Sequence, residues 1–587
     1  MAKTPTVSRG GVYRAGTTSF GLTANLDPTG EDQPGFGFGI FAATIRTLVG
    51  FNGQQGPSGI KLLPELATTV PTPTDNGLTY TFHLKSDIKF GPPVNREITS
   101  QDFAYAFQRI NDATLVPQYG YYYDGLIVGL SGTATNPDTP ISGIDTPDAT
   151  TIIFHLTRPQ GDFLQLLAMP ATAPIPPEVG KCFPQPATYG RDLISSGPYM
   201  FRGAASVNIS SCATITPMAG FNPTSEITLV RNPNYVASTG DTPDYLNGVD
   251  ITIDPNVADI FDKIRKGELD GSIFDNPPAT VASTYLTSPS LRKYFHSTVA
   301  YWSESISMNL AVPPFTNVHV RKAVEWVLDR SAMTVAMGGK EFVSTATHIN
   351  PPGFPGSLSA SYNPYPTPNE TGSLAKAKAQ MRLSPYDPKH NGQCNVAICK
   401  NLIFINISQF APIDPIVQTD LARIGIEISP RVLADTTAFL AIDNVHGLVP
   451  MSALGGGYSD YTGANSFAQP NFGSTAITGP SSCCNYSLVG LTRKQATAYG
   501  VPYPKGGIPS VDSIINRCQV ESGPTQDACF EDLDKTMMTS VVAWAPYMWG
   551  HYMVVTASTV TRYVMSQSTG SISLDQIAVR NHVTLSS

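Results

Sequence analysis

Alternation of apolar and polar residues predicts strands at several places along the chain. In LTYTFHL (78–84) every second residue is apolar, and TTIIFHL (150–156) has a similar pattern. Such alternation is typical of a strand with one buried and one wet face. The turn residues PTPTDNG just before the first of these segments predict a hairpin with residues 62–70.

A helical stripe lies between these two strands. In ITSQDFAYAFQRI the residues Phe103, Ala106, Phe107 and Ile110 fall on one face, and Thr99 or Ser100 can cap the helix. A second helix is expected at 162–169, directly after the second strand.

Strand-to-helix units recur later in the chain. A strand at 249–253 is followed by a helix at 257–266, with Gly267 as its C-terminal cap. The order strand, helix, strand is repeated at 401–407, 412–425 and 426–433, where a right-handed parallel crossover is the default connection. The pattern therefore predicts an α/β protein.

Composition narrows the function classes. With 587 residues the chain should form two or three domains. Its net charge is −8 and only 14% of residues are charged, which disfavours nucleic acid as a partner. No apolar run approaches the roughly 20 residues that span a bilayer. The start MAKTPTVSRGG has no apolar signal core and no lipobox cysteine, so we expect membrane contact only through a removed, lipid-anchored signal segment.

The eight cysteines favour an oxidising compartment. They form no CxxC pair and no zinc-finger spacing with histidine, so we expect no metal site and four disulfides. Cys394 with Cys399 would close a short loop, and Cys182 with Cys212 would flank a loop-rich stretch. The pairing of the remaining four stays open; they are Cys483, Cys484, Cys518 and Cys529. Buried free thiols in a cytosolic protein are the alternative.

Motifs for catalysis are missing from the sequence. No GxSxG, HExxH, P-loop or complete dinucleotide fingerprint occurs, and the histidines are scattered. We therefore expect no catalytic residue, no cofactor and no enzyme activity.

Several segments in a fixed order resemble the peptide/nickel class of ABC substrate-binding proteins, the family of oligopeptide- and dipeptide-binding proteins. The matching segments are LPELATTV, GLTYTFHLKSDIKF, ITSQDFAYAFQRI, SSGPYMF, LVRNPNY, DKIRKGELDG and MNLAVPPFTNVHVRKAVEWVLDRSAM with the following GGK. Together they extend over nearly the whole chain. Within them, Arg231 and Arg321 are interpreted as structural residues that fix turns or helix ends.

The resemblance implies a periplasmic-binding-protein-like fold of class II, cluster C: a three-lobe flytrap with mixed sheets and a hinged cleft between lobes. The implied lobes are lobe I from 1–52, 181–298 and 555–587, lobe II from 53–180, and lobe III from 299–554. It also implies an extracytoplasmic monomer, periplasmic or a cell-surface lipoprotein. Such a protein captures di- or oligopeptides and delivers them to ABC permease subunits with cytoplasmic ATPases.

One segment, LGGGYSDYTGANSF (454–467), resembles the family segment whose aspartate receives the α-amino group of a bound peptide. The resemblance carries this role to Asp460, with Gly457, Tyr458 and Tyr461 beside it. An ammonium presents three donors, so burying it requires a carboxylate or several acceptors. The alternative is an Asx-turn aspartate in a glycine-rich loop. Gly457 and Tyr458 replace the family's tryptophan and cysteine.

Other candidate contacts are weaker. Trp302 could face the cleft or pack in the core. Asp32 lies near a segment with which the family lines one cleft wall, and Tyr123 belongs to a tyrosine run that the family points toward the cleft edge, although core packing is an equal alternative. Rival functions are the same fold binding an oligosaccharide or a metal complex, and a peptide-sensing receptor without transport.

Overall fold

The computed structural model describes residues 9–18, 26–30, 36–136, 138–236, 244–273, 275–478 and 484–580. The chain divides into two compact units. Unit 1 is Met1–His296 with Met553–Ser587, and unit 2 is Ser297–Tyr552. The chain passes from one unit to the other within β12 (Phe295–Met308) and β17 (Trp544–Val555), which are neighbours in one sheet.

The main sheet of unit 1 is mixed. Its order is β11-β1-β10-β9-β7, with β8 paired to β9. β1 pairs parallel with β10 and β11, whereas β9 pairs antiparallel with β10 and β7. The strands are β1 (Val12–Thr17), β7 (Tyr199–Phe201), β8 (Phe221–Asn222), β9 (Glu226–Arg231), β10 (Gly248–Ile253) and β11 (Gly271–Ser272).

The helix that follows β10 confirms the strand-to-helix prediction. α5 (Val257–Lys266) begins after Asn256, whose side chain accepts from the Ala258 amide. It ends at Gly267, which has φ +77°, a conformation that glycine adopts without steric penalty.

A second sheet of unit 1 has the order β4-β6-β5, from β4 (Thr79–His83), β5 (Ile144–Asp148) and β6 (Thr151–His155). The predicted hairpin between residues 62–70 and β4 is wrong, because β4 pairs along its whole length with β6. Residues 62–70 reach this region through one isolated antiparallel bridge, between Ala67 and Leu84.

The helix α2 (Ser100–Asn111) confirms the stripe read from the sequence. The Thr99 and Asp102 side chains form a reciprocal capping box at its start. Its four predicted core residues are all buried. The next predicted helix is shorter than expected: α3 covers only Phe163–Leu166. Pro170, which lacks an N–H, stands where a longer helix would need a donor.

Short elements complete unit 1. The helices are α1 (Phe36–Thr44), α4 (Pro177–Gly180) and α6 (Ala279–Thr287). The strand pairs are β2 (Val49–Phe51) with β3 (Leu62–Pro64), β18 (Val560–Arg562) with β21 (Ala578–Val579), and β19 (Met565–Ser566) with β20 (Ser571–Ile572).

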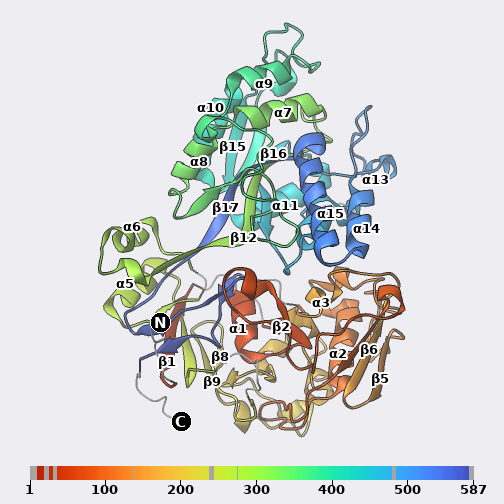
Figure 1. The fold of residues 1–587 in the computed structure, drawn as a ribbon, viewed down its shortest axis with the longest axis vertical. Helices are drawn as coiled ribbons and strands as arrows, with labels where there is room; N and C mark the ends of the chain where they lie inside the picture. Colours follow the sequence, from red (N-terminus) through yellow and green to blue (C-terminus); the bar gives the residue numbers. More distant parts are fainter. Residues whose placement is uncertain are drawn as a thin grey trace. The chain divides into compact units, whose positions relative to one another are not determined.

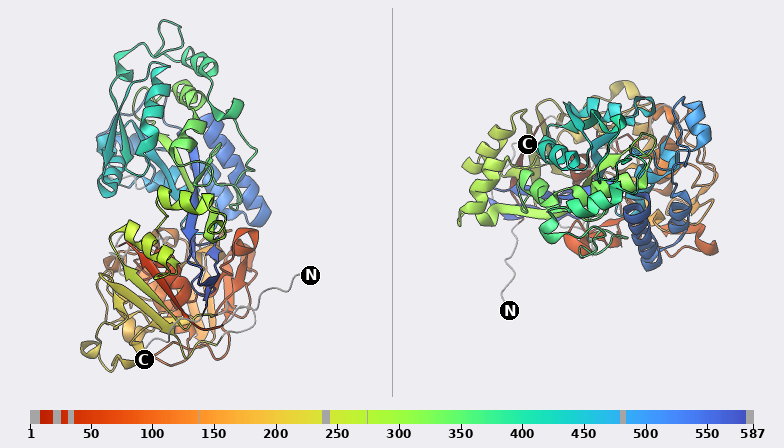
Figure 2. Two further views of the ribbon diagram at one scale, coloured as in Figure 1. Left: turned by 90° about the vertical axis from the view of Figure 1, so that its left-hand side faces the viewer. Right: turned by 90° about the horizontal axis from the view of Figure 1, so that it is seen from above.

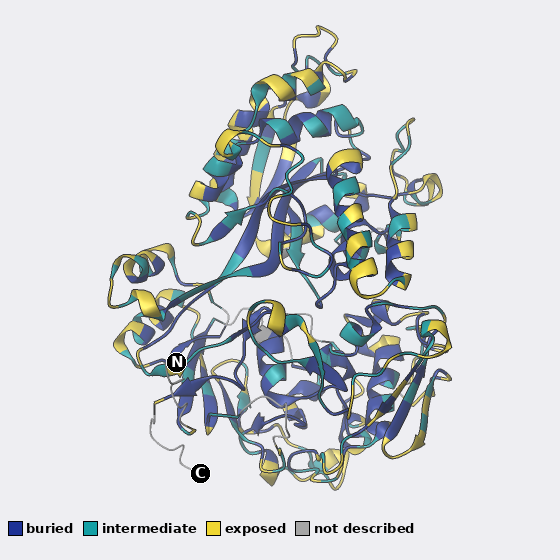
Figure 3. Ribbon diagram, viewed as in Figure 1, coloured by how far each residue is buried: buried dark blue, intermediate teal, exposed yellow. Residues whose placement is uncertain are grey.

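Unit 2 is built on a sheet of order β13-β17-β12-β16-β14-β15. Its other strands are β13 (Val343–Thr345), β14 (Leu402–Ile407), β15 (Ile428–Leu433) and β16 (Met451–Tyr458). β14 pairs parallel with β15, and α10 (Asp414–Ala422) connects them, so the predicted crossover is confirmed. β12 pairs antiparallel with β16. In Figure 3 the central strands of this sheet are mostly buried, whereas yellow exposed residues gather on its helices.

The remaining helices of unit 2 are α7 (Val318–Val327), α8 (Arg330–Ala336), α9 (Leu374–Met381), α11 (Asp435–Asp443), α12 (Asn465–Phe472), α13 (Arg493–Ala498), α14 (Asp512–Val520) and α15 (Gly523–Thr536). α14 and α15 pack side by side, as Figures 1 and 2 show. The apolar stripe of α7 is fully buried in the core of this unit, as its sequence predicts.

Three disulfides are present among the described residues: Cys182–Cys212, Cys394–Cys399 and Cys518–Cys529. The first two confirm the pairings suggested by spacing, and the third settles part of what spacing left open. Cys483 lies outside the described residues, so the fourth disulfide stays a prediction.

Within the described ranges, no helix is both long and apolar enough to cross a membrane.

Candidate functional site

Aromatic candidates of unit 2 lie on neighbouring strands. β12 and β16 pair so that Trp302 lies opposite Tyr458. Their rings stack with centroids 5.2 Å apart and an interplanar angle of 17°. Tyr552 of β17 stacks on Tyr458 in turn, at 6.1 Å and 14°. The three strands thus present a stack of nearly parallel rings, which we call the aromatic stack (Trp302, Tyr458, Tyr552).

Glycines make room for this arrangement. A Cβ on Gly550 would lie 1.9 Å from Cε3 of Trp302, so the indole occupies the space that a side chain would need. A Cβ on Gly456 would lie 1.9 Å from the Ser303 carbonyl oxygen, and Gly456 has φ +152°. At Gly457, with φ +133°, a Cβ would meet nothing within 4 Å. The glycines of β16 therefore serve close strand pairing and leave open space beside Gly457.

The candidate Asp460 lies two residues after the end of β16 and is half-buried. The segment is held to β12 because the Ser459 amide donates to the Tyr301 carbonyl at 3.1 Å. Tyr461 is buried, and its Oη accepts from Asn465 Nδ2 at 3.2 Å, at the start of α12. Asp460 thus lies two residues beyond the Tyr458 ring, at the end of the aromatic stack's own strand.

Glu304, which the sequence analysis did not single out, contacts Trp302 of the aromatic stack. It is 6% exposed, and its Oε1 accepts from Trp302 Nε1 at 2.8 Å. Its Oε2 has no hydrogen-bond partner, and none of the described cationic groups pairs with it. Burial raises the pKa of Glu304 to about 8, and the Trp302 hydrogen bond offsets part of this rise. At neutral pH the carboxyl therefore carries its proton.

Tyr123 does not join these candidates. It is fully buried in unit 1, its Oη donates to the Leu166 carbonyl at 2.8 Å, and its ring packs edge-on against Phe107. Its only polar side-chain atom is thus committed to the backbone, which favours the core alternative, and its role as a ligand contact stays a prediction. Asp32 lies outside the described residues, so its role stays a prediction.

Arg231 and Arg321 have the structural role that the sequence predicts for them. Arg231 pairs with Asp244 and donates to the carbonyl of the same residue at 2.8 Å. Arg321 donates to the Val541 carbonyl at 2.7 and 3.0 Å and to the Phe315 carbonyl, near the start of α7. Both side chains satisfy backbone groups, as expected for residues that fix turns and helix ends.

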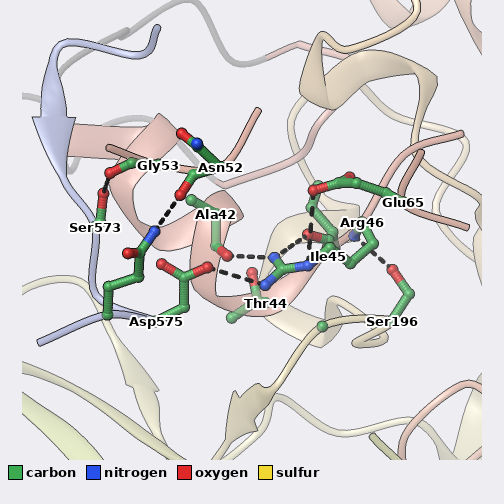
Figure 4. Close-up of polar contacts among 12 residues, drawn as sticks. Ala42, Thr44, Ile45, Arg46, Asn52, Gly53, Glu65, Ser196, Ser573 and Asp575 are labelled. Atoms are coloured by element: carbon green, nitrogen blue, oxygen red, sulfur yellow. Dashed lines mark hydrogen bonds and ion pairs between the residues drawn. The ribbon is translucent and has the colours of Figure 1, made fainter. Parts of the chain in front are cut away.

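A second polar centre lies in unit 1 around Arg46, whose contacts Figure 4 shows. The guanidinium pairs with Asp575 at 3.0 Å and with Glu65 at 3.8 Å, and donates to the Ala42 and Ile45 carbonyls. It borders a cavity of about 460 Å³, lined among others by Lys85, Asp87 and Lys89. Because Arg46 is committed to protein partners that join α1 to the C-terminal segment, we interpret this centre as structural.

No group of three or more metal-ligating side chains occurs in the part of the chain that the structure describes.

Comparison with known proteins decides the family. A family model described as bacterial extracellular solute-binding proteins, family 5 Middle, matches residues 61–479, more than half of the chain. The chain belongs to this family. The resemblance read from the sequence motifs is thereby confirmed.

Two curated relatives of this family 5 protein are named as peptide-binding proteins. The periplasmic oligopeptide-binding protein OppA of Escherichia coli (strain K12) is 27% identical over 257 residues, 43% of this chain and 42% of that protein. Di/tripeptide-binding protein 4 of Pseudomonas aeruginosa (strain UCBPP-PA14) is 26% identical over 228 residues, 38% of each chain. The chain thus spans less than half the length of these curated relatives.

A solved structure shows the same fold over almost all of the family 5 protein. Clavulanic acid biosynthesis oligopeptide binding protein 2 superposes with a TM-score of 0.82 at 22% identity, covering 97% of this chain and 96% of the other. The predicted α/β fold of a periplasmic binding protein, with mixed sheets, is confirmed. Its division into three lobes with the stated boundaries stays a prediction.

Proposed function

We propose that this protein is an extracytoplasmic solute-binding protein that captures di- or oligopeptides and delivers them to the permease of an ABC importer. The observation that carries the proposal is Asp460, a half-buried carboxylate two residues after a ring of the aromatic stack. A carboxylate can neutralise the α-ammonium of a peptide, and flat rings suit the extended chain that follows it. The names of its relatives support the same ligand class.

The proposal includes the finer expectations from the resemblance. The protein works without cofactor, metal or catalysis, as a monomer that contacts ABC permease subunits with cytoplasmic ATPases. It is periplasmic or carried at the cell surface by a lipid anchor. Trp302, Tyr458, Gly457, Tyr461 and Asp460 form the ligand-facing set.

An oligosaccharide is the second candidate ligand, because the aromatic stack would serve sugar rings as well. A sugar has no ammonium, so Asp460 separates the two candidates.

The test is a double-mutant cycle between Asp460 and the peptide ammonium. Asp460→Asn keeps the size and one acceptor but removes the charge. Truncating one partner of a buried charge pair costs about 2 to 5 kcal/mol, so a free-amine tripeptide should lose about thirty-fold or more in affinity. The N-acetylated tripeptide should bind the wild type weakly and lose much less on mutation.

Calorimetry on both peptides with both proteins gives the coupling energy. A value near zero would mean that Asp460 is a loop residue and that the ligand is anchored elsewhere or is not a peptide.

A further inference from the structure

Glu304 differs from the other buried acids of unit 2. Glu325 pairs with Arg330, and Asp534 accepts from the amides of Ile349 and Asn350 at 3.2 and 3.1 Å. Glu304 is 6% exposed, none of the described cations pairs with it, and its Oε2 has no hydrogen-bond partner. Oε1 of Glu325 has no partner either, but Arg330 neutralises that carboxylate. Buried polar groups without partners are uncommon in native proteins because each one is destabilising, so Oε2 of Glu304 needs an explanation.

Among the described residues, no positive charge is found around Glu304. On its own strand it faces Trp302, and the titratable groups around it are Tyr458 of β16, Tyr547 of β17 and, beyond Tyr547, Asp414 of α10. The residue directly opposite on β16 is Gly456. Because a Cβ there would collide with the Ser303 carbonyl, this position of β16 cannot provide a side-chain partner. The buried Oε2 of Glu304 therefore has no partner from the residue directly opposite.

We propose that Glu304, Trp302 and Tyr458 form a subsite for a guanidinium group of the ligand, which donates an N–H to the unpartnered Oε2 of Glu304. A guanidinium suits this position because it is planar and presents several donors in one plane. The inference rests on the proposed function and deepens it: an arginine side chain of the bound peptide would fill the subsite while Asp460 receives the α-ammonium.

Filling this subsite is coupled to a proton. Burial keeps Glu304 protonated near neutral pH. When the guanidinium binds, the carboxyl O–H bond breaks, the proton passes to the buffer, and the carboxylate accepts the guanidinium N–H. Binding below pH 8 therefore releases up to one proton, and affinity for the cation rises about tenfold per pH unit up to that point.

The experiment compares arginine with citrulline, which has nearly the same shape and no charge. Arg-Ala-Ala, Ala-Arg-Ala, Ala-Ala-Arg and their citrulline counterparts are titrated calorimetrically at pH 6.5 in two buffers of different ionisation enthalpy. For one arginine position we expect close to one extra proton released relative to citrulline. We also expect at least tenfold tighter binding of that peptide at pH 8. The α-ammonium titrates in both members of each pair, so its contribution cancels.

Glu304→Gln should abolish both differences, because an amide still accepts from Trp302 but has no proton to release. Glu427→Gln, at an exposed glutamate of the same unit, should leave both unchanged. Wild-type proton release needs no variant, so the inference remains testable even if Glu304→Gln folds poorly.

Trialanine and agmatine separate this inference from the proposed function. Trialanine binding without any arginine effect would overturn the subsite and leave the peptide function standing. Agmatine binding to the wild type but not to Glu304→Gln would support the subsite even if peptides failed to bind. Absence of binding by all of these probes would overturn both.

Discussion

Replacing Glu304 by glutamine should change how the stability of unit 2 depends on pH. Glu304 is 6% exposed, and burial raises its pKa from 4.5 to about 8. In an unfolded chain the same carboxyl titrates near its ordinary value. Between these two values the folded protein holds a proton that the unfolded chain has released. The free energy of unfolding therefore falls as pH rises through this window.

The magnitude follows from the size of the shift. At about 1.36 kcal/mol per pH unit, a shift from 4.5 to about 8 corresponds to a loss of about 5 kcal/mol, complete above pH 8. The glutamine side chain in Glu304→Gln keeps an acceptor for Trp302 Nε1 and cannot ionise, so the variant lacks this loss. Glu325 and Asp534, whose pKa values burial raises to about 7, titrate in both proteins and cancel in the difference.

Tryptophan fluorescence during urea unfolding measures this difference, since all four tryptophans, at 302, 326, 544 and 549, belong to unit 2. The stability of Glu304→Gln relative to wild type should rise between pH 5 and pH 9. Glu427→Gln is the control, because Glu427 is exposed and should show no such trend. The reasoning is refuted if the difference in the free energy of unfolding between wild type and Glu304→Gln stays constant within about 0.5 kcal/mol across this pH range.

Two further predictions concern the fold. Alkylation in denaturant without reductant should label no cysteine if all eight are oxidised, and more than two labelled thiols would contradict the disulfides. Gly550→Ala should destabilise unit 2 by about 1 to 3 kcal/mol and shift the Trp302 emission, because the added Cβ meets the indole. Gly506→Ala, where a Cβ meets nothing, is the matched control, and equal denaturation midpoints for the two variants would contradict this packing.

Elements with local signals were predictable from sequence. The cap residues and the apolar stripe of α5 lie within a dozen positions of each other. The helix and its C-terminal glycine are therefore found at the predicted residues. The hairpin prediction for 62–84 failed because strand pairing is a long-range choice: β4 pairs with β6, some seventy residues later. Sequence spacing could not rank that partner above the nearer one.

The candidate site shows the same limit. Tyr458 was named because it stands in a recognisable segment, and Trp302 because it is an aromatic residue that could face the cleft. Tyr552 and Gly550 come from β17 and meet them only through the sheet. Glu304 had a weak signal, since it is two residues from Trp302 on a strand and so shares its face. That its second oxygen finds no partner depends on the residue across the strand pair, which only the register reveals.

The glycines of β16 show how one motif can serve two purposes. Read as sequence, the run at 455–457 belongs to the segment whose aspartate is expected to receive the α-amino group of a bound peptide. In the structure Gly456 is required by its own neighbour, since any side chain would strike the Ser303 carbonyl, while only Gly457 faces open space. The absence of a side chain at Gly456 is what leaves Glu304 without a cross-strand partner. A constraint of strand packing thus leaves Oε2 of Glu304 without a partner from the residue opposite, and the arginine and citrulline peptides test whether a ligand supplies one.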